Sequence, residues 1–409
     1  MPSDRLLAAL TSELNELHSS GTAKGAELVI ESVRPAGAGH GPRYRLAGQG
    51  QRDFLRMNSN SYLGMALRAE ILEAEEDATS RFGAGPGAVR FISGSFSPHI
   101  ELEERLAAFH GREAAMIFSS AYATTLGVLV PLTTKETVVV SDELNHNCII
   151  NAMRLSRPAA KLIYRHNDMD DLEAKLGEAV GRGRRAIVVT DGIFSMRGDH
   201  APLDRLIEIC RGFDDRFPEN VVVMVDDSHG VGAFGATGRG TEEYAESGPA
   251  DVLVATLGKA LGVNGGYVAG ARTLIDYLRE KAATYIYSNP ITAGEAAAAK
   301  KAVDILDSPT GRELLDHLRA MTKRFEKGLV ELGYETIPGE HPVVPLMVRD
   351  TERTSALVRH LFDNGVLATG LNYPVVPKGD EEIRFQVNAD HTEADIDAVL
   401  EVLEGFPRD

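Results

Sequence analysis

The sequence lacks several features that mark specialised classes of protein. Among its 409 residues there is no tryptophan and there are only two cysteines, too few for a disulfide framework or a cluster of thiolate metal ligands. It contains no internal repeat or low-complexity tract, and no apolar run is long enough to span a bilayer. The opening leucines stand between acidic residues in an amphipathic helical pattern, unlike the apolar core of a signal peptide. We therefore predict a cytoplasmic protein without a membrane partner.

Positive charge is also scarce. The chain has 43 lysines and arginines against 60 aspartates and glutamates, which gives a formal net charge of -17. This balance argues against a nucleic-acid partner, while small-molecule substrates remain open. The hydrophobic content of 43% and charged content of 25% are those of an ordinary globular protein. Because one core rarely serves more than about 250 to 300 residues, we expect two domains.

The hydrophobic pattern predicts an α/β fold. From about residue 114, short β-branched runs alternate with stretches of helical period, as in a mostly parallel central sheet flanked by helices. After Pro290 the chain changes to long helical stretches with a few short strand candidates, which predicts a smaller C-terminal α+β domain. We therefore expect an N-terminal arm at 1–55, a large domain at 56–290 and a small domain at 291–409.

Polar residues gather where the expected strands end. Five such clusters are SSAY, DELNH, DGIFSM, DDSHG and TLGK. In open parallel sheets, ligands bind outside the carboxyl ends of the strands. The five clusters therefore predict one functional site along that edge of the sheet.

Three motifs within this edge have competing explanations. The stretch Gly230–Gly235, GVGAFG, matches the dinucleotide-binding pattern, but no amphipathic helix follows it, so an NAD-binding module remains only an alternative. A phosphate-binding P-loop is excluded at Lys259, because the upstream glycine is missing and Ala260 replaces serine or threonine. His146 and Cys148 form only a weak pair of metal ligands, so no metal site is predicted.

Lysine at the end of an apolar strand suggests a different chemistry. A poorly solvated lysine such as Lys259 attacks carbonyl carbons and forms Schiff bases. Pyridoxal phosphate is bound in this way, with an acid at its ring nitrogen and a helix N-terminus at its phosphate. Asp226 follows a buried strand, and Ser119–Tyr122 precede an apolar helical pattern. Asp226 and Asp227 should point to opposite faces of their strand, so they need not share a role.

Each of these residues has an ordinary structural explanation when taken alone. Lys259 could be a surface lysine with a buried stem, Ser195 a turn hydroxyl and His146 a hydrogen-bonded structural histidine. The prediction therefore depends on the set of residues and on their order along the chain.

That order resembles the α-oxoamine synthases, a branch of the fold type I pyridoxal-phosphate enzymes. The matching segments run from NSYLG near residue 60 to DHT near residue 391 and include DDSHGVG, TLGKALG and IRFQVNADHT. Within the family the chain is most similar to the 2-amino-3-ketobutyrate CoA ligases, which are glycine C-acetyltransferases, notably in VRFISG, SDELNH and TDGIFSM. The resemblance implies the fold type I transferase fold, pyridoxal 5'-phosphate as cofactor and a homodimer with shared active sites.

The resemblance also implies roles for the residues around the cofactor ring. Lys259 is expected to bind the cofactor covalently and later to move the substrate's α-proton. Asp226 is expected to pair with the pyridine nitrogen, and His146 to stack on the face of the ring and meet the substrate. His229 and Ser195 should lie near the phenolic oxygen.

The phosphate is expected to have ligands from two subunits. The resemblance implies backbone amides of Ala121 and Tyr122 and the hydroxyl of Thr256 within one subunit. Ser288 and Asn289 match a segment that, in the family, reaches the phosphate of the neighbouring subunit.

The implied reaction joins an amino acid, most simply glycine, to an acyl-CoA, most simply acetyl-CoA. Asn60 and Arg384 match the positions that hold the amino acid's carboxylate, a task suited to a bidentate guanidinium. Thr124 and Thr125 depart from the family pattern near the expected acyl and cofactor entrance, which leaves the acyl group and its carrier open. Alternatives are an 8-amino-7-oxononanoate synthase or specialised oxoamine synthase using another acyl-CoA or acyl-carrier protein, and an aminotransferase or amino-acid aldolase of the same fold.

Overall fold

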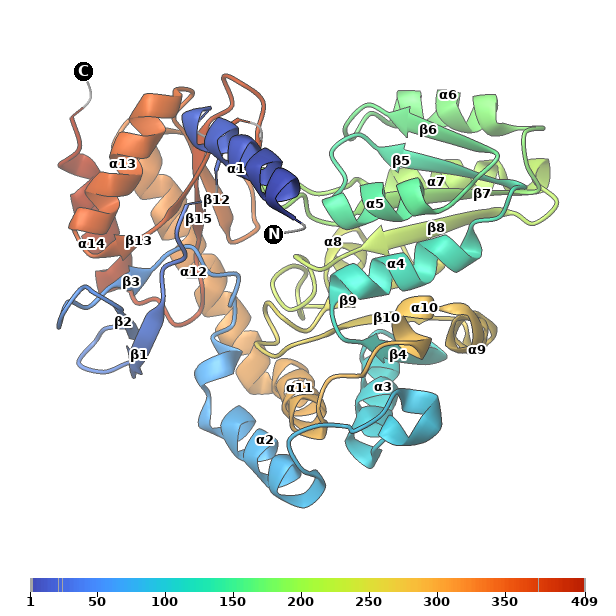
Figure 1. The fold of residues 1–409 in the computed structure, drawn as a ribbon, viewed down its shortest axis with the longest axis horizontal. Coiled ribbons are helices and arrows are strands. Elements are labelled where there is room, and N and C mark those ends of the chain that lie inside the picture. The colour runs from blue at the N-terminus through green and yellow to red at the C-terminus, as the bar shows by residue number, and fades with distance from the viewer. Residues whose placement is uncertain (1–2, 21, 24, 374, 408–409) are drawn as a thin grey trace.

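A seven-stranded sheet forms the centre of the computed structural model, which describes residues 3–20, 22–23, 25–373 and 375–407 (Figure 1). Its strands are β4 (Ala114–Phe118), β5 (Thr137–Asp142), β6 (Ala160–Tyr164), β7 (Arg185–Asp191), β8 (Val221–Asp226), β9 (Val252–Thr256) and β10 (Gly266–Gly270). They follow the order β4-β10-β9-β8-β7-β5-β6. Only β10 runs antiparallel to its neighbours among these strands. The predicted mostly parallel sheet is confirmed.

Helices cover both faces of this sheet, as the predicted α/β fold requires. They are α3 (Ser97–Phe109), α4 (Ala121–Leu132), α5 (Asn147–Leu155), α6 (Met169–Ala179), α7 (Leu203–Gly212), α8 (Thr241–Ala245), α9 (Arg272–Lys281) and α10 (Ala283–Ile286). Val139 of β5 packs in a cluster with residues of α4, α5 and α9, whereas Val138 and Val140 pack with α6 and α7. Successive residues of a strand point to opposite faces, so a strand covered on both faces is apolar along its whole length.

A second, smaller sheet forms the C-terminal part of the chain. Its strands β11 (Glu335–Thr336), β12 (Val343–Met347), β15 (Glu382–Gln386) and β14 (Thr369–Leu371) pair antiparallel in that order. The accompanying helices are α12 (Pro309–Glu331), α13 (Thr351–Asp363) and α14 (Glu393–Glu404). The preceding helix α11 (Ala293–Leu306) instead packs against α3 and α2 (Ala69–Phe82). The domain boundaries themselves stay a prediction.

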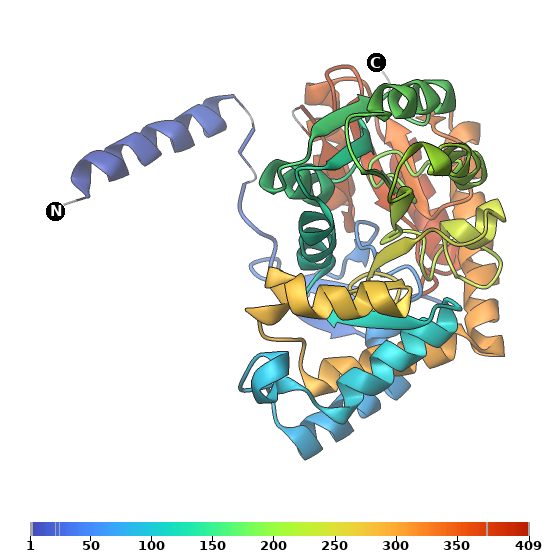
Figure 2. The ribbon, with the colours of Figure 1, turned by 90° about the vertical axis from the view of Figure 1, so that its right-hand side faces the viewer.

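The N-terminal segment divides into a projecting helix and a docked loop. Helix α1 (Asp4–Ser19) has no buried residue and extends away from the body of the molecule (Figure 2). The hairpin of β1 (Ile30–Arg34) and β2 (Arg43–Leu46) follows, and β3 (Leu55–Arg56) pairs in parallel with β13 (Val366–Leu367).

No helix within the described ranges is both long and apolar enough to cross a bilayer. Short helical turns complete the fold at η1 (Met65–Leu67), η2 (Arg90–Gly94) and η3 (Asp214–Arg216).

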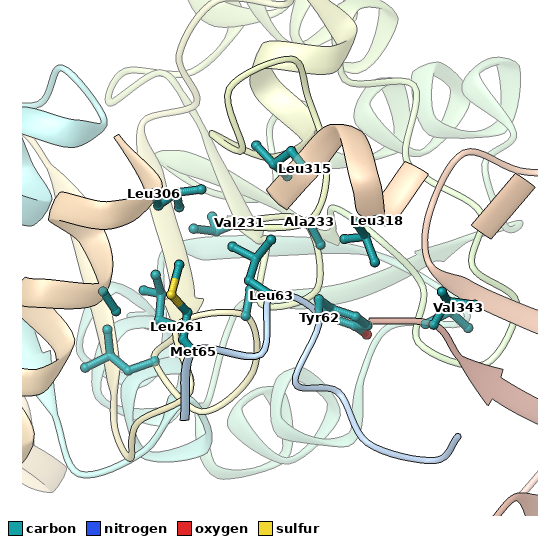
Figure 3. Close-up of a cluster of buried hydrophobic side chains, with 14 of the residues drawn as sticks. Tyr62, Leu63, Met65, Val231, Ala233, Leu261, Leu306, Leu315, Leu318 and Val343 are labelled. Atoms are coloured by element: carbon teal, nitrogen blue, oxygen red, sulfur yellow. The ribbon is translucent and has the colours of Figure 1, made fainter. Parts of the chain in front are cut away.

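One buried apolar cluster joins the two sheets. Tyr62 and Leu63, which follow β3, pack in it with Leu261 from the loop after β9, Leu318 of α12 and Val343 of β12 (Figure 3). This cluster crosses the predicted boundary at residue 290. It therefore holds the carboxyl ends of β8 and β9 in a fixed position relative to the small sheet.

Candidate active site

A cavity of about 280 Å³ lies along the carboxyl edge of the central sheet. Its walls are formed by Ala121, Tyr122, His146, Cys148, Asp191, Ile193, Ser195, Asp226, Ser228, His229, Thr256 and Lys259. The sequence predicted all of these as site residues except Cys148, Asp191, Ile193 and Ser228. The clusters at the strand ends therefore meet at one place, as parallel topology requires.

Lys259 lies half-buried in the loop that follows β9. Burial lowers the pKa of its amine from 10.5 to about 8, although the charges of Asp226 and Asp191 act in the opposite direction. Burial disfavours the ammonium form because the cation loses its hydration. The fraction of free, nucleophilic amine near neutral pH is therefore far larger than that of an ordinary lysine.

This lowered pKa predicts the pH dependence of amine labelling. In the cofactor-free protein, the rate of Lys259 acetylation by acetic anhydride should rise with a midpoint near pH 8, since only the free amine reacts. The exposed Lys161 of β6 serves as the control for the reactivity of the reagent at each pH. Quantitative mass spectrometry measures acetylation of the two peptides. A midpoint for Lys259 at or above the ordinary lysine value of 10.5 would contradict its predicted environment.

Asp226 ends β8 with its carboxylate held toward the cavity. Its Oδ2 accepts hydrogen bonds from Thr125 Oγ1 at 3.2 Å and from Cys148 Sγ at 3.6 Å, and its Oδ1 accepts one from the Ser228 amide at 3.2 Å. Thr125 and Thr124 are fully buried, so the expectation that they lie at the acyl entrance is wrong. Thr125 instead orients the carboxylate that faces the lysine.

Asp227 points away from the cavity, as the strand periodicity predicted. It accepts hydrogen bonds from the hydroxyl and the amide of Thr241, and burial raises its pKa to about 7. A β-carbon at Gly230 or Gly240 would lie within 2.1 Å of this carboxylate. Of the glycines in GVGAFG, Gly230 packs against Asp227, Gly232 against Ala260 and Gly235 against Glu243. The motif therefore encloses side chains of its own chain, and the dinucleotide-binding alternative has no structural basis.

The N-terminus of α4 opens onto the cavity. Ser120 caps it by accepting a hydrogen bond from the Ala123 amide at 3.1 Å. The first amides of a helix have no partner within the helix, so those of Ala121 and Tyr122 can bind an anion. Thr256, at the end of β9, adds a hydroxyl to the same wall. A β-carbon at Gly266 would lie 2.3 Å from the Ala121 nitrogen, so glycine is required for this close packing.

His146 caps α5 on another side of the cavity. Its amide donates to Asp191 Oδ2 at 2.9 Å, and its Nδ1 lies 2.9 Å from Cys148 Sγ. Burial, with the added effect of the Asp226 charge, raises the pKa of Asp191 well above its ordinary value. Asp191 was missed as a site residue, although its place at a strand end, in DGIFSM, was a usable signal. Cys148 lacked such a signal, because its contact with Asp226 depends on packing.

His229 belongs to a buried hydrogen-bonded group that only the tertiary structure assembles. Its Nδ1 lies 2.8 Å from the Tyr62 hydroxyl, and its carbonyl accepts a hydrogen bond from His341 Nε2 at 2.8 Å. Burial lowers the pKa of His229 well below its ordinary value, so the ring is neutral at physiological pH. Tyr62 and His341 were not predicted as site residues, because they are distant from His229 in sequence.

Asn60 and Arg384 meet beside Ser195, which lines the cavity. Arg384 of β15 donates from Nη1 to the Ser195 carbonyl at 3.0 Å and from Nη2 to Asn60 Oδ1 at 3.4 Å. The Tyr62 hydroxyl also donates to Asn60 Oδ1, at 3.3 Å. Burial lowers the pKa of Arg384, yet an arginine stays charged in proteins. The predicted carboxylate-binding pair is therefore assembled as a fixed cation beside the cavity.

Ser288 and Asn289 follow α10 and do not line the cavity of their own chain. The Ser288 hydroxyl makes only a long contact of 3.5 Å with the Asn289 carbonyl. Their expected contact with the phosphate of a neighbouring subunit stays a prediction.

Comparison with known proteins gives one consistent family. A model described as aminotransferase class I and II matches residues 52–403. The 8-amino-7-oxononanoate synthase of Thermosipho melanesiensis is 40% identical over 354 residues, covering 86% of this chain and 88% of that protein. The same enzyme of Symbiobacterium thermophilum is 38% identical over 393 residues, covering 96% and 95%. A serine palmitoyltransferase of S. paucimobilis that carries pyridoxal phosphate joined to myriocin has a TM-score of 0.85 and 26% identity, with 98% of this chain and 96% of that chain covered.

The residues around the cavity fit pyridoxal phosphate. A lysine of lowered pKa faces a carboxylate of fixed orientation, and a helix N-terminus with an adjacent hydroxyl provides the donors that a phosphate needs. The identity and coverage of the relatives establish both the family and the cofactor. The chain therefore belongs to the class I and II aminotransferase family and, within it, to the pyridoxal-phosphate-dependent α-oxoamine synthases.

Proposed function

We propose that this enzyme condenses a small amino acid with an acyl thioester longer than acetyl, in the manner of the 8-amino-7-oxononanoate synthases. The observation that supports it most is that Arg384, paired with Asn60, is hydrogen-bonded to Ser195 in the wall of the cavity that holds Lys259. The identity of 38–40% to those synthases over most of the chain supports it further. The related enzymes named here are not glycine C-acetyltransferases, so they support the alternative prediction better than the acetyl-CoA one.

The product of those relatives indicates the kind of substrate. The chain of 8-amino-7-oxononanoate has nine carbons. Its last two carbons and the amino group correspond to alanine without its carboxylate, and its first seven carbons correspond to a dicarboxylic acyl group. The reaction forms a bond between the amino acid's α-carbon and the thioester carbonyl, with release of the thiol. The bond to the carboxylate breaks, and carbon dioxide leaves. Alanine, glycine and serine are all small enough to be candidates.

Five residues act around the cofactor ring in this proposal. The cofactor supplies an electron sink for the charge left on the substrate's α-carbon. Lys259 holds the cofactor and accepts the α-proton at Nζ, because its lowered pKa makes it a base near neutral pH. Asp226 keeps the ring nitrogen protonated, and His146 covers the ring face. His229 and Ser195 provide polar groups toward the phenolic oxygen.

The phosphate and the substrate carboxylate bind at opposite ends of the site. The amides of Ala121 and Tyr122 and the hydroxyl of Thr256 bind the phosphate, where the helix dipole favours an anion. Arg384 binds the amino acid's carboxylate through its planar guanidinium, with Asn60 fixing its direction. Binding of the carboxylate in this way fixes the orientation of the substrate's α-carbon toward Lys259.

A second copy of the chain completes the site in this proposal. Ser288 and Asn289 are close to Tyr287, which is 81% exposed, and helix α10 lies near Phe91 and Ile92, which are 68% and 67% exposed. Large apolar side chains at such exposure are typical of surfaces that a partner covers. A homodimer would cover them and bring Ser288 and Asn289 to the neighbouring phosphate.

Thiol release measured across a panel of acyl-CoA donors tests the proposed function. With alanine, glycine and serine in turn, heptanoyl- and pimeloyl-CoA should give higher kcat/KM than acetyl-CoA, and carbon dioxide should appear in equal amount. Optimal turnover of glycine with acetyl-CoA would instead support a glycine C-acetyltransferase. Amino transfer to a keto acid without thiol release would support an aminotransferase.

A further inference from the structure

A second cavity, of about 180 Å³, opens beside the active site between the two sheets. It shares Ser195 with the main cavity. Its apolar walls come from the small sheet with its loops and from the loops that follow β5 and β7: Leu144, Phe194, Met196, Ile337, Met347, Val375, Val376 and Pro377. Its remaining polar residues are Arg197, Asp380 and Glu382. An apolar chain attached to a substrate in the main cavity could enter this space directly.

Glu382 is the unusual residue in this wall. Only 2% of it is exposed, and its Oε1 is buried with no hydrogen-bond partner among the described residues. Glu382 and Arg384 are two positions apart on β15, so their side chains leave the strand on the same face. A buried carboxyl oxygen without a partner has lost its hydration with no compensating hydrogen bond, so such groups in native proteins call for a specific explanation.

The charges around Glu382 favour a donor group over an anion. Burial raises the pKa of Glu382 to about 8, against the lowering effect of Arg384 and Arg197. Asp380 also lines the cavity, but it is paired with Arg349, whose Nη1 lies 3.4 Å from its Oδ1. Arg197 is engaged with Asp199, since its Nε donates to Oδ2 at 2.9 Å. The burial that disfavours the ionised form of Glu382 would also disfavour a substrate carboxylate beside it, whereas a hydroxyl or amino group could donate to the unpartnered Oε1.

We propose that this cavity holds the distal end of the acyl group and that Glu382 selects acyl chains ending in a hydrogen-bond donor over those ending in a carboxylate. The proposal rests on the proposed acyltransferase function and narrows its substrate class to ω-hydroxy or ω-amino acyl thioesters. A preference for such acyl groups would distinguish this enzyme from relatives whose product ends in a carboxylate. Glu382 is then a specificity-determining residue that meets the substrate far from the reacting carbon.

Four acyl-CoA donors with acyl chains of equal length test this inference with the full-length holoenzyme. Their acyl groups are heptanoyl, ω-hydroxyheptanoyl, ω-aminoheptanoyl and pimeloyl. We expect kcat/KM for the hydroxy and amino donors to exceed that for pimeloyl-CoA by about tenfold or more, the size of one satisfied buried hydrogen bond. Glu382→Gln keeps the shape of the side chain and should lower the preference for the amino donor. Glu382→Arg should shift the preference toward pimeloyl-CoA.

The controls separate the two proposals. Glu335→Gln, on β11 of the same sheet, alters an exposed glutamate paired with Arg349 and should leave the donor ranking unchanged. Cofactor absorbance and melting temperature show whether each Glu382 variant folds. A wild-type preference for pimeloyl-CoA, or an equal effect of Glu382→Gln on all four donors, would overturn the role of Glu382 while the condensation stands. Absence of thiol release from every donor would instead overturn the proposed function.

Discussion

Replacement of Lys259 by alanine should lower the rate of thiol release by at least about 10³-fold, because in the proposed reaction one side chain both holds the cofactor and moves the proton. The lysine amine has a pKa lowered to about 8 by burial, and Asp226 lies close enough to act on it. Alanine provides neither a nucleophile nor a base. Borohydride reduction of the wild type should leave the cofactor fixed to the peptide that contains Lys259, and the variant should yield no such peptide.

The fold of the Lys259→Ala variant should be intact. Burial disfavours the charged amine, so the lysine destabilises the cofactor-free protein below pH 8, and its removal should not lower the melting temperature at pH 7. Because the unfolded chain binds more protons between pH 8 and pH 10.5, this group makes wild-type stability rise with pH in that window. Lys161→Ala, at an exposed position, is the matched control and should keep full activity. Full activity in the Lys259 variant, or a cofactor fixed elsewhere, would refute the assignment.

Replacement of Arg384 by alanine should raise KM for the amino acid by roughly 30-fold or more. Removal of one partner from a buried charge pair costs about 2 to 5 kcal/mol, and about 1.4 kcal/mol corresponds to a tenfold change. Arg384 is positioned by Asn60 and the Ser195 carbonyl, so its guanidinium is ready to meet a carboxylate. Steady-state kinetics with each substrate varied in turn should show a much smaller change in KM for the acyl thioester.

Two further variants test whether the guanidinium itself is needed. Arg384→Lys keeps the charge but loses the planar pair of donors, so its KM should lie between those of wild type and Arg384→Ala. Arg349→Ala removes an exposed arginine paired with Glu335 and should change neither KM. An equal rise in both KM values for Arg384→Ala would indicate a general loss of structure and would contradict carboxylate binding.

Local pattern was enough to predict part of the walls of the main cavity. Lys259, Asp226 and His146 each stand at or just after the carboxyl end of a strand of the central sheet, and parallel strands bring these ends to one edge. Alternation along β8 also predicted that Asp226 and Asp227 would separate, as they do. These are short-range consequences of strand geometry, so they can be predicted from sequence.

Other parts of the site could not be predicted in this way. Thr125 was expected near the acyl entrance, but helix α4 turns it inward to Asp226. Cys148 lines the cavity without having been predicted to do so, and unlike Asp191 it does not stand at a strand end. The contacts of Thr125 and Cys148 depend on how α4 and α5 pack against the sheet, and no periodicity within one segment determines that.

The parallel sheet, the strand-end site and the resemblance to the α-oxoamine synthases could be read from the amino-acid sequence, because apolar periodicity and the order of motifs are properties of the linear chain. Which distant groups meet at the site depends on the folded arrangement. Asn60 and Arg384 are 324 positions apart, yet they share a hydrogen bond. The second cavity, with the unpartnered Oε1 of Glu382, likewise exists only where the small sheet meets the loops that follow β5 and β7. Long-range hydrogen bonds and cavities of this kind follow from the packing of whole elements in the shared core.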